Sequence, residues 1–254
     1  MGFKCGIIGL PNVGKSTLFN ALTESNKAEA ANYPFATIEP NVGRVSVPDK
    51  RLWILGRLAK SEKIIPAYMD FVDIAGLVKG ASSGEGLGNK FLSHIREVDV
   101  IVHVVRCFED ANISHVSSNI NPIDDIETIS TELKIADIET LENKKISLEK
   151  KSKQDKNYNK QISFIDKIIN KISSNIKFTN KELEKEEVDF FKSLNLISSK
   201  PMLYVCNVDE KSIIEGNNLS NMVEEKSKEF NCQSVIISAS IEAQIAELDD
   251  KSDK

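Results

Sequence analysis

Short apolar runs of strand length alternate with stretches of helical periodicity along most of the chain. Residues 3–8 form one such run, and the apolar positions of residues 17–22 have helical spacing. Five further runs of strand length are Arg44–Val47, Tyr68–Ile74, Val100–Val105, Met202–Asn207 and Ser234–Ser238. Because helical stretches separate most of these runs, the pattern predicts an α/β domain in which helices cover both faces of a mainly parallel sheet.

Residues 122–199 have a different pattern, with few strand signals and many Lys, Glu, Ile and Asn residues. Two apolar stripes with helical spacing occur there: Ile126, Ile129, Leu133 and Ala136 in the first, and Ile162, Ile165, Ile169, Ile172 and Ile176 in the second. Polar residues 151–159 lie between the stripes and are typical of a turn. We therefore predict an antiparallel helical hairpin inserted into a sheet domain made of residues 1–121 and 200–254. Residues 179–182, Thr-Asn-Lys-Glu, have the form of a capping box and predict the start of a further helix.

The composition is that of a soluble globular protein. The 254 residues are 41% hydrophobic and 28% charged, and they include no stretch of 18 apolar residues. The N-terminus lacks the charged-then-apolar order of a signal peptide, so we expect no membrane partner and a cytoplasmic location. Cys5, Cys107, Cys206 and Cys232 are far apart and form no C-x-x-C pair, which favours buried free thiols over disulfides or zinc ligands.

Charge is unevenly distributed along the chain. The net charge of −5 argues against wholesale electrostatic binding to nucleic acid, so DNA is not an expected partner. Between Lys144 and Lys160, however, seven lysines accompany only Glu149 and Asp155, which gives a local charge of +5. This lysine tip, at the predicted turn of the hairpin, is either a solvated helix end or a surface that binds RNA phosphates.

A phosphate-binding loop is the clearest chemical motif. Residues 9–16 read Gly-Leu-Pro-Asn-Val-Gly-Lys-Ser, which matches G-x-x-x-x-G-K-[ST]. The motif lies between the first predicted strand and the first predicted helix, where its backbone N–H groups and the helix N-terminus can point at phosphates. We expect Lys15 to reach the β- and γ-phosphates and the Ser16 hydroxyl to ligate Mg²⁺.

Three further positions fit a switch that senses the γ-phosphate. Asp73, at the end of a predicted strand, is expected to hold Mg²⁺ through water, and the N–H of Gly76 can reach the γ-phosphate. Thr37, before the second strand, is expected to complete the Mg²⁺ coordination when the γ-phosphate is present. Residues 77–88 are rich in glycine, which favours a mobile switch loop and leaves a disordered linker as the alternative.

The loop that recognises the base is expected to follow the strand that ends at Asn207. GTPases of this architecture have N-K-x-D there, and the aspartate accepts two hydrogen bonds from guanine. This chain has Asn207-Val208-Asp209-Glu210, in which Val208 replaces the lysine and Glu210 is one methylene longer than aspartate. From these residues alone, guanine specificity is an open question. Ser238, Ala239 and Ser240, after the last predicted strand, resemble the final base-contacting loop of the same architecture.

Together these motifs resemble those of the Obg-related YchF family of ATPases. The matching segments cover essentially the whole chain: Gly9–Thr17, Asn32–Asn41, Phe71–Asn89, His103–Glu109, Asn207–Glu210 and Ile245–Asp250. The resemblance implies a P-loop domain of translation-factor GTPase descent with a coiled-coil insertion, a preference for ATP over GTP, and association with the ribosome and its RNA. It also implies that Asn207 and Glu210 frame the base and that Val208 contacts adenine.

The expected reaction is attack of water on the γ-phosphorus. Charge would be neutralised by Lys15, Mg²⁺ and the N–H groups of a run of six residues: Asn12, Val13, Gly14, Lys15, Ser16 and Thr17. Leu77 stands directly after Gly76, where a water-positioning glutamine is expected, and its apolar side chain cannot orient water. We therefore expect slow hydrolysis, unless another group substitutes.

The resemblance supplies the remaining expectations. It implies a catalytic role for His115 and a monovalent cation such as K⁺ near Asn12. Family members continue into a C-terminal TGS domain, which we expect to be absent here because the chain stops at Lys254. We expect a monomer. Two alternatives remain open at this point: a GTPase with a degenerate base pocket, and a nucleotide-gated adapter that binds RNA or the ribosome with negligible turnover.

Overall fold

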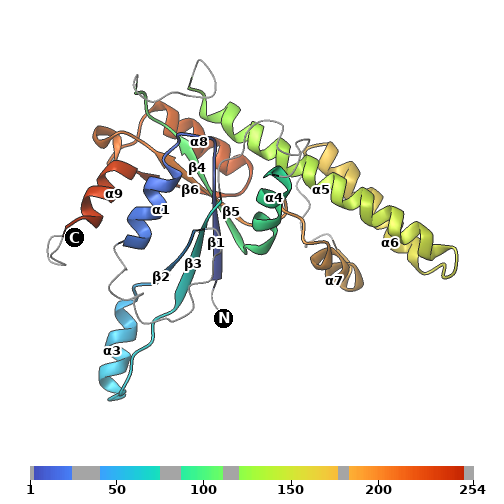
Figure 1. The fold of residues 1–254 in the computed structure, drawn as a ribbon, viewed down its shortest axis with the longest axis horizontal. Helices are drawn as coiled ribbons and strands as arrows, with labels where there is room; N and C mark the ends of the chain where they lie inside the picture. Colours follow the sequence, from blue (N-terminus) through green and yellow to red (C-terminus); the bar gives the residue numbers. More distant parts are fainter. Residues whose placement is uncertain (1–2, 25–40, 75–86, 111–119, 177–182, 249–254) are drawn as a thin grey trace.

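The fold is a twisted six-stranded sheet with helices on both faces (Figure 1). The computed structural model describes residues 3–24, 41–74, 87–110, 120–176 and 183–248. The strands are β1 (Phe3–Ile8), β2 (Val42–Ser46), β3 (Tyr68–Asp73), β4 (Val100–Arg106), β5 (Met202–Asn207) and β6 (Gln233–Ile237). Their order is β2-β3-β1-β4-β5-β6, and only β2, which pairs with β3, is antiparallel. The prediction of a mainly parallel sheet is confirmed.

Helices cover both faces because the central strands are apolar on both sides. Residues 101–106 of β4 are all buried, as expected for a strand enclosed between two helical layers. On one face lie α1 (Lys15–Glu24) and α9 (Ala239–Ala246), and on the other lie α4 (Leu87–Glu97), the start of α5 (Pro122–Ser152) and α8 (Asn218–Glu229) (Figure 1). Among the described helices, none is both long enough and apolar enough to span a bilayer.

The predicted helical hairpin is present. The long helix α5 and the antiparallel α6 (Tyr158–Ser173) are joined at residues 153–157 and project together from the sheet (Figure 1). The outer half of α5 packs on α6 through Leu141, Leu148, Ile165 and Ile168. Ile176, the last residue of the predicted second stripe, lies beyond α6 and is exposed.

The two apolar stripes pack against different parts of the protein. Ile129, Leu133 and Ala136 belong to the core between the sheet and α4, and Ile126 packs with residues of β4, β5 and α8. The first stripe therefore faces the sheet and not the partner helix of the hairpin. Periodicity shows which side of a helix is apolar but not what covers it, so the sequence alone does not show that α5 packs on both the sheet and α6.

Two further helices differ from expectation. The helix expected from residues 179–182 begins at Lys185 as α7 (Lys185–Leu194); residues 179–182 themselves lie outside the described part of the chain. Its capping box is formed instead by Glu184 and Glu187, whose carboxylate accepts the Glu184 N–H at 3.2 Å. The helix α3 (Lys50–Leu58) was not predicted. It protrudes beyond β2 and β3, buries none of its residues, and leaves Trp53 58% exposed (Figure 1).

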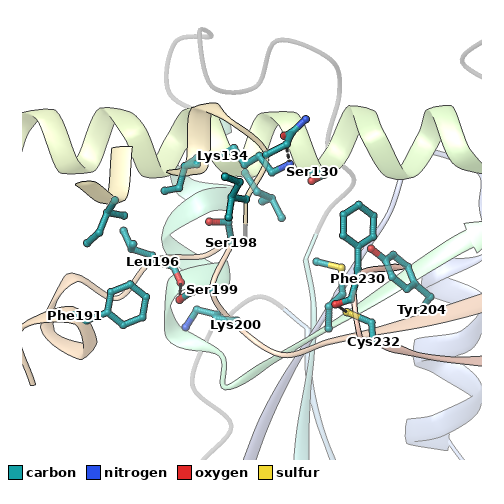
Figure 2. Close-up of a pocket in the computed structure, with 16 residues that line it drawn as sticks. Ser130, Lys134, Phe191, Leu196, Ser198, Ser199, Lys200, Tyr204, Phe230 and Cys232 are labelled. Carbon is teal, nitrogen blue, oxygen red and sulfur yellow. Dashed lines mark hydrogen bonds between the residues drawn. The ribbon is translucent and has the colours of Figure 1, made fainter. Parts of the chain in front are cut away.

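A small cavity of about 100 Å³ lies where α5 leaves the sheet (Figure 2). Figure 2 shows Ser130 and Lys134 of α5 on one wall and Tyr204, Phe230 and Cys232 on another. Its two lysines are engaged by the protein: Lys134 donates to Oδ1 of Asn175 at 2.8 Å, and Lys200 donates to the carbonyls of Arg96 and Val98. The cavity is a largely apolar packing gap at the base of the hairpin, and no phosphate-loop residue lines it.

Candidate nucleotide-binding site

The phosphate loop connects β1 to α1 in a conformation that its sequence requires. Gly14 has a φ of +96°, which is unfavourable for residues with a Cβ, and a Cβ there would collide with Nδ2 of Asn207. Asn12 also takes a left-handed conformation, with a φ of 61°. The helix α1 begins directly afterwards at Lys15, so its N-terminal N–H groups face the loop.

The Lys15 ammonium is held inside the loop. The side chain is only 8% exposed, and Nζ donates to the carbonyl of Leu10 at 2.6 Å. Burial lowers the pKa of Lys15 to about 8, and the Asp73 carboxylate partly offsets that effect. A buried ammonium at the N-terminus of a helix is a strong site for a polyanion.

Two of the predicted magnesium ligands meet beside this loop. Asp73 ends β3, which pairs with β1 so that Asp73 lies opposite Ile7. The Ser16 hydroxyl donates to Oδ2 of Asp73 at 3.4 Å, while Oδ1 of Asp73 is buried and accepts no hydrogen bond from the described residues. A buried carboxylate oxygen without a donor costs free energy unless a cation or its bound water approaches it, so these residues fit Mg²⁺.

The magnesium site would depend on the nucleotide as well as on the protein. The described residues contain no cluster of three or more His, Cys, Asp and Glu side chains that could hold a metal. One hydroxyl and one carboxylate are typical of Mg²⁺, which keeps several waters and takes its remaining ligands from phosphates. The third predicted ligand, Thr37, lies outside the described residues.

The side chain of Asn207 links the phosphate loop to the loop that contains Ala239. Its Nδ2 donates to the carbonyl of Val13 at 2.9 Å, and its Oδ1 accepts the N–H of Ala239 at 2.9 Å. The side chain is buried, and both ends of its amide are used within the protein. Asn207 therefore fixes the base end of the site relative to the phosphate loop.

A cavity of about 520 Å³ brings most of the predicted nucleotide-binding residues together. The predicted residues that line it are Asn12, Gly14, Thr17, Asn207, Val208, Glu210, Ala239 and Ser240. Val13 and Ser238 are buried behind this surface, and the hydroxyl groups of Ser238 and Ser240 lie 2.9 Å apart in a shared hydrogen bond.

Four lining residues were not predicted: Asp209, inside the predicted base loop, and three residues after β4. Phe108, Glu109 and Asp110 follow β4 and line the cavity beside the Asn207–Glu210 loop, which follows the adjacent strand β5. Ligands of parallel α/β sheets bind beyond the carboxyl ends of the strands, so the position of these residues directly after a buried strand was the available signal.

Several predicted residues cannot be placed. Gly76, Leu77 and His115 lie outside the described residues, as Thr37 does. His103, by contrast, is a core residue of β4 at 1% exposure, with its ring 5.5 Å from that of Tyr204. Burial and, to a lesser extent, the Lys15 charge lower the pKa of His103 to about 3, so its ring is neutral.

Comparisons with known proteins agree with this geometry. The family model described as 50S ribosome-binding GTPase matches residues 4–148. The chain is 51% identical over 252 residues to the ribosome-binding ATPase YchF of Haemophilus influenzae, covering 99% of this chain and 69% of that protein. It is 49% identical to the protein of the same name from Bacillus subtilis, covering 98% of this chain and 69% of the relative.

A solved structure extends the match to three dimensions. The structure of the YchF GTPase of Schizosaccharomyces pombe is similar with a TM-score of 0.83 and 35% identity, over 99% of this chain and 69% of that one. This chain therefore spans about two thirds of the length of its relatives. The sequence identity, its extent and the shared fold agree, and the chain belongs to the YchF family of P-loop nucleotide hydrolases.

Proposed function

We propose that this protein binds ATP in preference to GTP, hydrolyses it slowly with Mg²⁺, and uses the nucleotide as a switch in association with ribosomes. The observation that carries the proposal is the 520 Å³ cavity, which joins the phosphate loop to a base loop with Val208 and Glu210 in place of lysine and aspartate. The Haemophilus relative is named an ATPase and the Schizosaccharomyces structure a GTPase, so base preference is the point to test.

The chain's own residues would act mainly by positioning. The Lys15 ammonium would leave the Leu10 carbonyl for the β- and γ-phosphates, and the N–H groups of residues 12–17 would bind the phosphate oxygens. Water attacks the γ-phosphorus, the bond to the β–γ bridging oxygen breaks, and ADP and phosphate leave. Bound Mg²⁺, held through Ser16 and Asp73 with Thr37, would neutralise charge on the phosphates.

The proposed catalytic details rest on the family resemblance. His115 would act on the attacking water, and the Gly76 N–H would contact the γ-phosphate. With Leu77 in place of a water-positioning glutamine, turnover would be slow. Asn12, which lines the cavity in a left-handed backbone conformation, would support a bound K⁺. We also propose that the protein acts as a cytoplasmic monomer.

The base preference is tested by measuring dissociation constants for Mg²⁺–ATP and Mg²⁺–GTP by calorimetry. Guanine presents N1–H and N2–H donors that an aspartate accepts, and adenine has no donor at those positions. We expect ATP to bind about tenfold more tightly than GTP, the effect of one or two well-placed hydrogen bonds. The double substitution Val208→Lys with Glu210→Asp recreates N-K-x-D and should shift the preference toward GTP.

The single substitution Glu210→Asp is the matched control, because it changes the carboxylate without restoring the lysine. Tighter binding of GTP than ATP by the unaltered protein would overturn the proposed base preference and favour a GTPase with a degenerate base pocket.

The proposed ribosome contact includes the lysine tip. Six of its lysines are exposed, namely Lys144, Lys150, Lys151, Lys153, Lys156 and Lys160, whereas Lys145 pairs with Asp166 at 2.6 Å. Replacing the six exposed lysines by glutamine should weaken binding to purified ribosomes and flatten its salt dependence, because fewer counterions are released from RNA phosphates. Co-sedimentation across a salt series measures both effects.

Arginine at the same six positions is the matched control for the lysine tip, since it keeps the charge, and it should bind like the unaltered protein. If the glutamine variant keeps the full affinity and salt slope, the lysine tip is only a solvated helix end.

A further inference from the structure

Arg106 is the largest of the fully buried side chains described, and it lies beside the nucleotide cavity. It ends β4, opposite Asn207 in the parallel register, and is 1% exposed. A buried guanidinium has five N–H donors that need acceptors, so its surroundings must be built around it. Its position and its cost in free energy indicate a role beyond filling space.

The guanidinium turns forward along the chain and holds the segment that follows β4. Its Nε donates to the carbonyl of Phe108 at 3.2 Å, and one Nη donates to the carbonyl of Asp110 at 3.2 Å. The guanidinium carbon also lies 4.7 Å from the centroid of the Phe108 ring. Arg106 thus fixes both the backbone and the aromatic ring of residues 108–110.

Cys107, directly before this segment, is held by other hydrogen bonds. The Cys107 N–H donates to the carbonyl of Asn207 at 2.8 Å, and Nδ2 of Asn217 donates to the carbonyl of Cys107 at 2.7 Å. Residue 107 is therefore held by β5 and α8, whereas residues 108–110 extend into the cavity wall and are held by Arg106.

These contacts fix the position of one part of the cavity lining. Residues 108–110 and the loop of residues 207–210 both line the cavity, and they follow the adjacent strands β4 and β5. The phosphate loop lies at the other end, where Asn12, Gly14 and Thr17 line the cavity. A purine ring bound at this end of the cavity would be sensitive to the position of residues 108–110, whereas phosphates bound at the phosphate loop would not.

We propose that Arg106 is a positioning residue that holds residues 108–110 of the cavity lining in the place that binding of a purine base requires. It acts through the backbone and the ring of Phe108 and does not touch the nucleotide. This inference rests on the proposed function only in taking the bound ligand to be a purine nucleotide. Lysine cannot replace Arg106, because it lacks the planar fork that reaches two carbonyls while stacking on a ring.

The test compares a ligand that has a base with one that has none. Binding of Mg²⁺–ATP, Mg²⁺–GTP and inorganic tripolyphosphate is measured by calorimetry for the unaltered protein and for Arg106→Lys and Arg106→Gln. We expect ATP to bind about tenfold more weakly to both variants, as when one or two hydrogen bonds lose their geometry. Tripolyphosphate, which needs only the phosphate loop, should bind unchanged, and the ratio of ATP to GTP affinity should move toward one.

The matched control is Arg96→Lys. Arg96 also donates to backbone carbonyls, those of Ala136 and Asn195, but on α4 and away from the cavity lining. For the Arg96→Lys variant, the ratio of ATP affinity to tripolyphosphate affinity should equal that of the unaltered protein. If Arg106→Gln unfolds, Arg106→Lys, which keeps the charge, still gives the ratio at a temperature below its melting transition.

The outcomes separate this inference from the proposed function. Unchanged ATP affinity in the Arg106 variants, or an equal loss for ATP and tripolyphosphate, would overturn the positioning role. A preference of the unaltered protein for GTP would overturn the proposed base preference alone, because the comparison of purine nucleotide with tripolyphosphate would still report on Arg106.

Discussion

Replacing Lys15 by methionine is expected to abolish ATP binding and, at the same time, to stabilise the nucleotide-free protein. The ammonium is the only side-chain cation among the described residues of the phosphate loop, and its loss should weaken ATP binding by about 100-fold or more. Its pKa of about 8, against 10.5 in solution, means that keeping it charged when folded costs about 3 kcal/mol. Methionine fills similar space without that cost.

Calorimetry and thermal melting of the nucleotide-free protein measure the two effects of Lys15→Met. Lys134→Met is the matched control, because burial also lowers the pKa of Lys134, which donates to Asn175 at the base of the hairpin and not in the nucleotide cavity. It should leave ATP binding unchanged. If Lys15→Met retains ATP affinity, the assignment of the phosphate site is wrong.

The same lysine gives the pH dependence of the unaltered protein a definite sign. Its folded pKa is lowered, so the cost of the buried charge is present below about pH 8 and is lost as the pH rises toward 10.5. The contribution of Lys15 to the free energy of unfolding of the nucleotide-free protein should therefore rise between pH 7 and pH 10. ATP should bind more weakly as the pH rises above 8, because the neutral lysine must then take up a proton.

The sequence was most informative where chemistry requires particular residues at fixed spacing. The phosphate loop predicts the tight turn at Gly14 and the place of Lys15 at the start of the first helix, since both follow from wrapping backbone around phosphates. The meeting of Ser16 with Asp73 follows from parallel strands whose carboxyl ends share one edge of the sheet. These parts of the site depend on local motifs and topology, which a single sequence reveals.

The parts that were missed depend on packing between distant segments. Arg106 reads as the polar end of a strand, and nothing in the sequence indicates that it turns to hold Phe108 and Asp110. Likewise, the stripe of residues 126–136 shows an apolar side but not that the sheet covers it. The helix α3 is an exception, because Leu52, Leu55 and Leu58 recur at helical spacing and were an available signal, although the helix buries none of its residues.

Replacing Asp137 by alanine is expected to have the largest effect on stability. Asp137, on α5, is fully buried, and its carboxylate accepts the N–H groups of Ile197 at 2.9 Å and Ser198 at 2.7 Å. Arg96 of α4 lies 3.5 Å from the same carboxylate. Alanine would leave two backbone donors and a guanidinium without this acceptor, so we expect a loss of about 3–5 kcal/mol in the free energy of unfolding.

Urea unfolding followed by circular dichroism measures this loss as a lower midpoint at an unchanged slope. Asp137→Asn should cost less, because its amide oxygen can still accept one of the two N–H groups. Asp166→Ala is the matched surface control: Asp166 pairs with Lys145 at 2.6 Å but is 45% exposed, and such pairs contribute about 0.5 kcal/mol or less. A cost below about 1 kcal/mol for Asp137→Ala would contradict the prediction.

The reason for the large effect is that this one carboxylate joins three segments with separate roles. Arg96 belongs to α4, which follows residues 75–86; Asp137 belongs to the helix that continues into the hairpin; and residues 197–198 lead into β5 and Asn207. Burial raises the pKa of Asp137, and the N–H donors and Arg96 partly oppose that shift, so the buried carboxylate depends on all three segments for its partners. Asp137→Ala should therefore also loosen the attachment of the hairpin to the sheet, which hydrogen exchange would detect as faster exchange of the Ile197 and Ser198 amides.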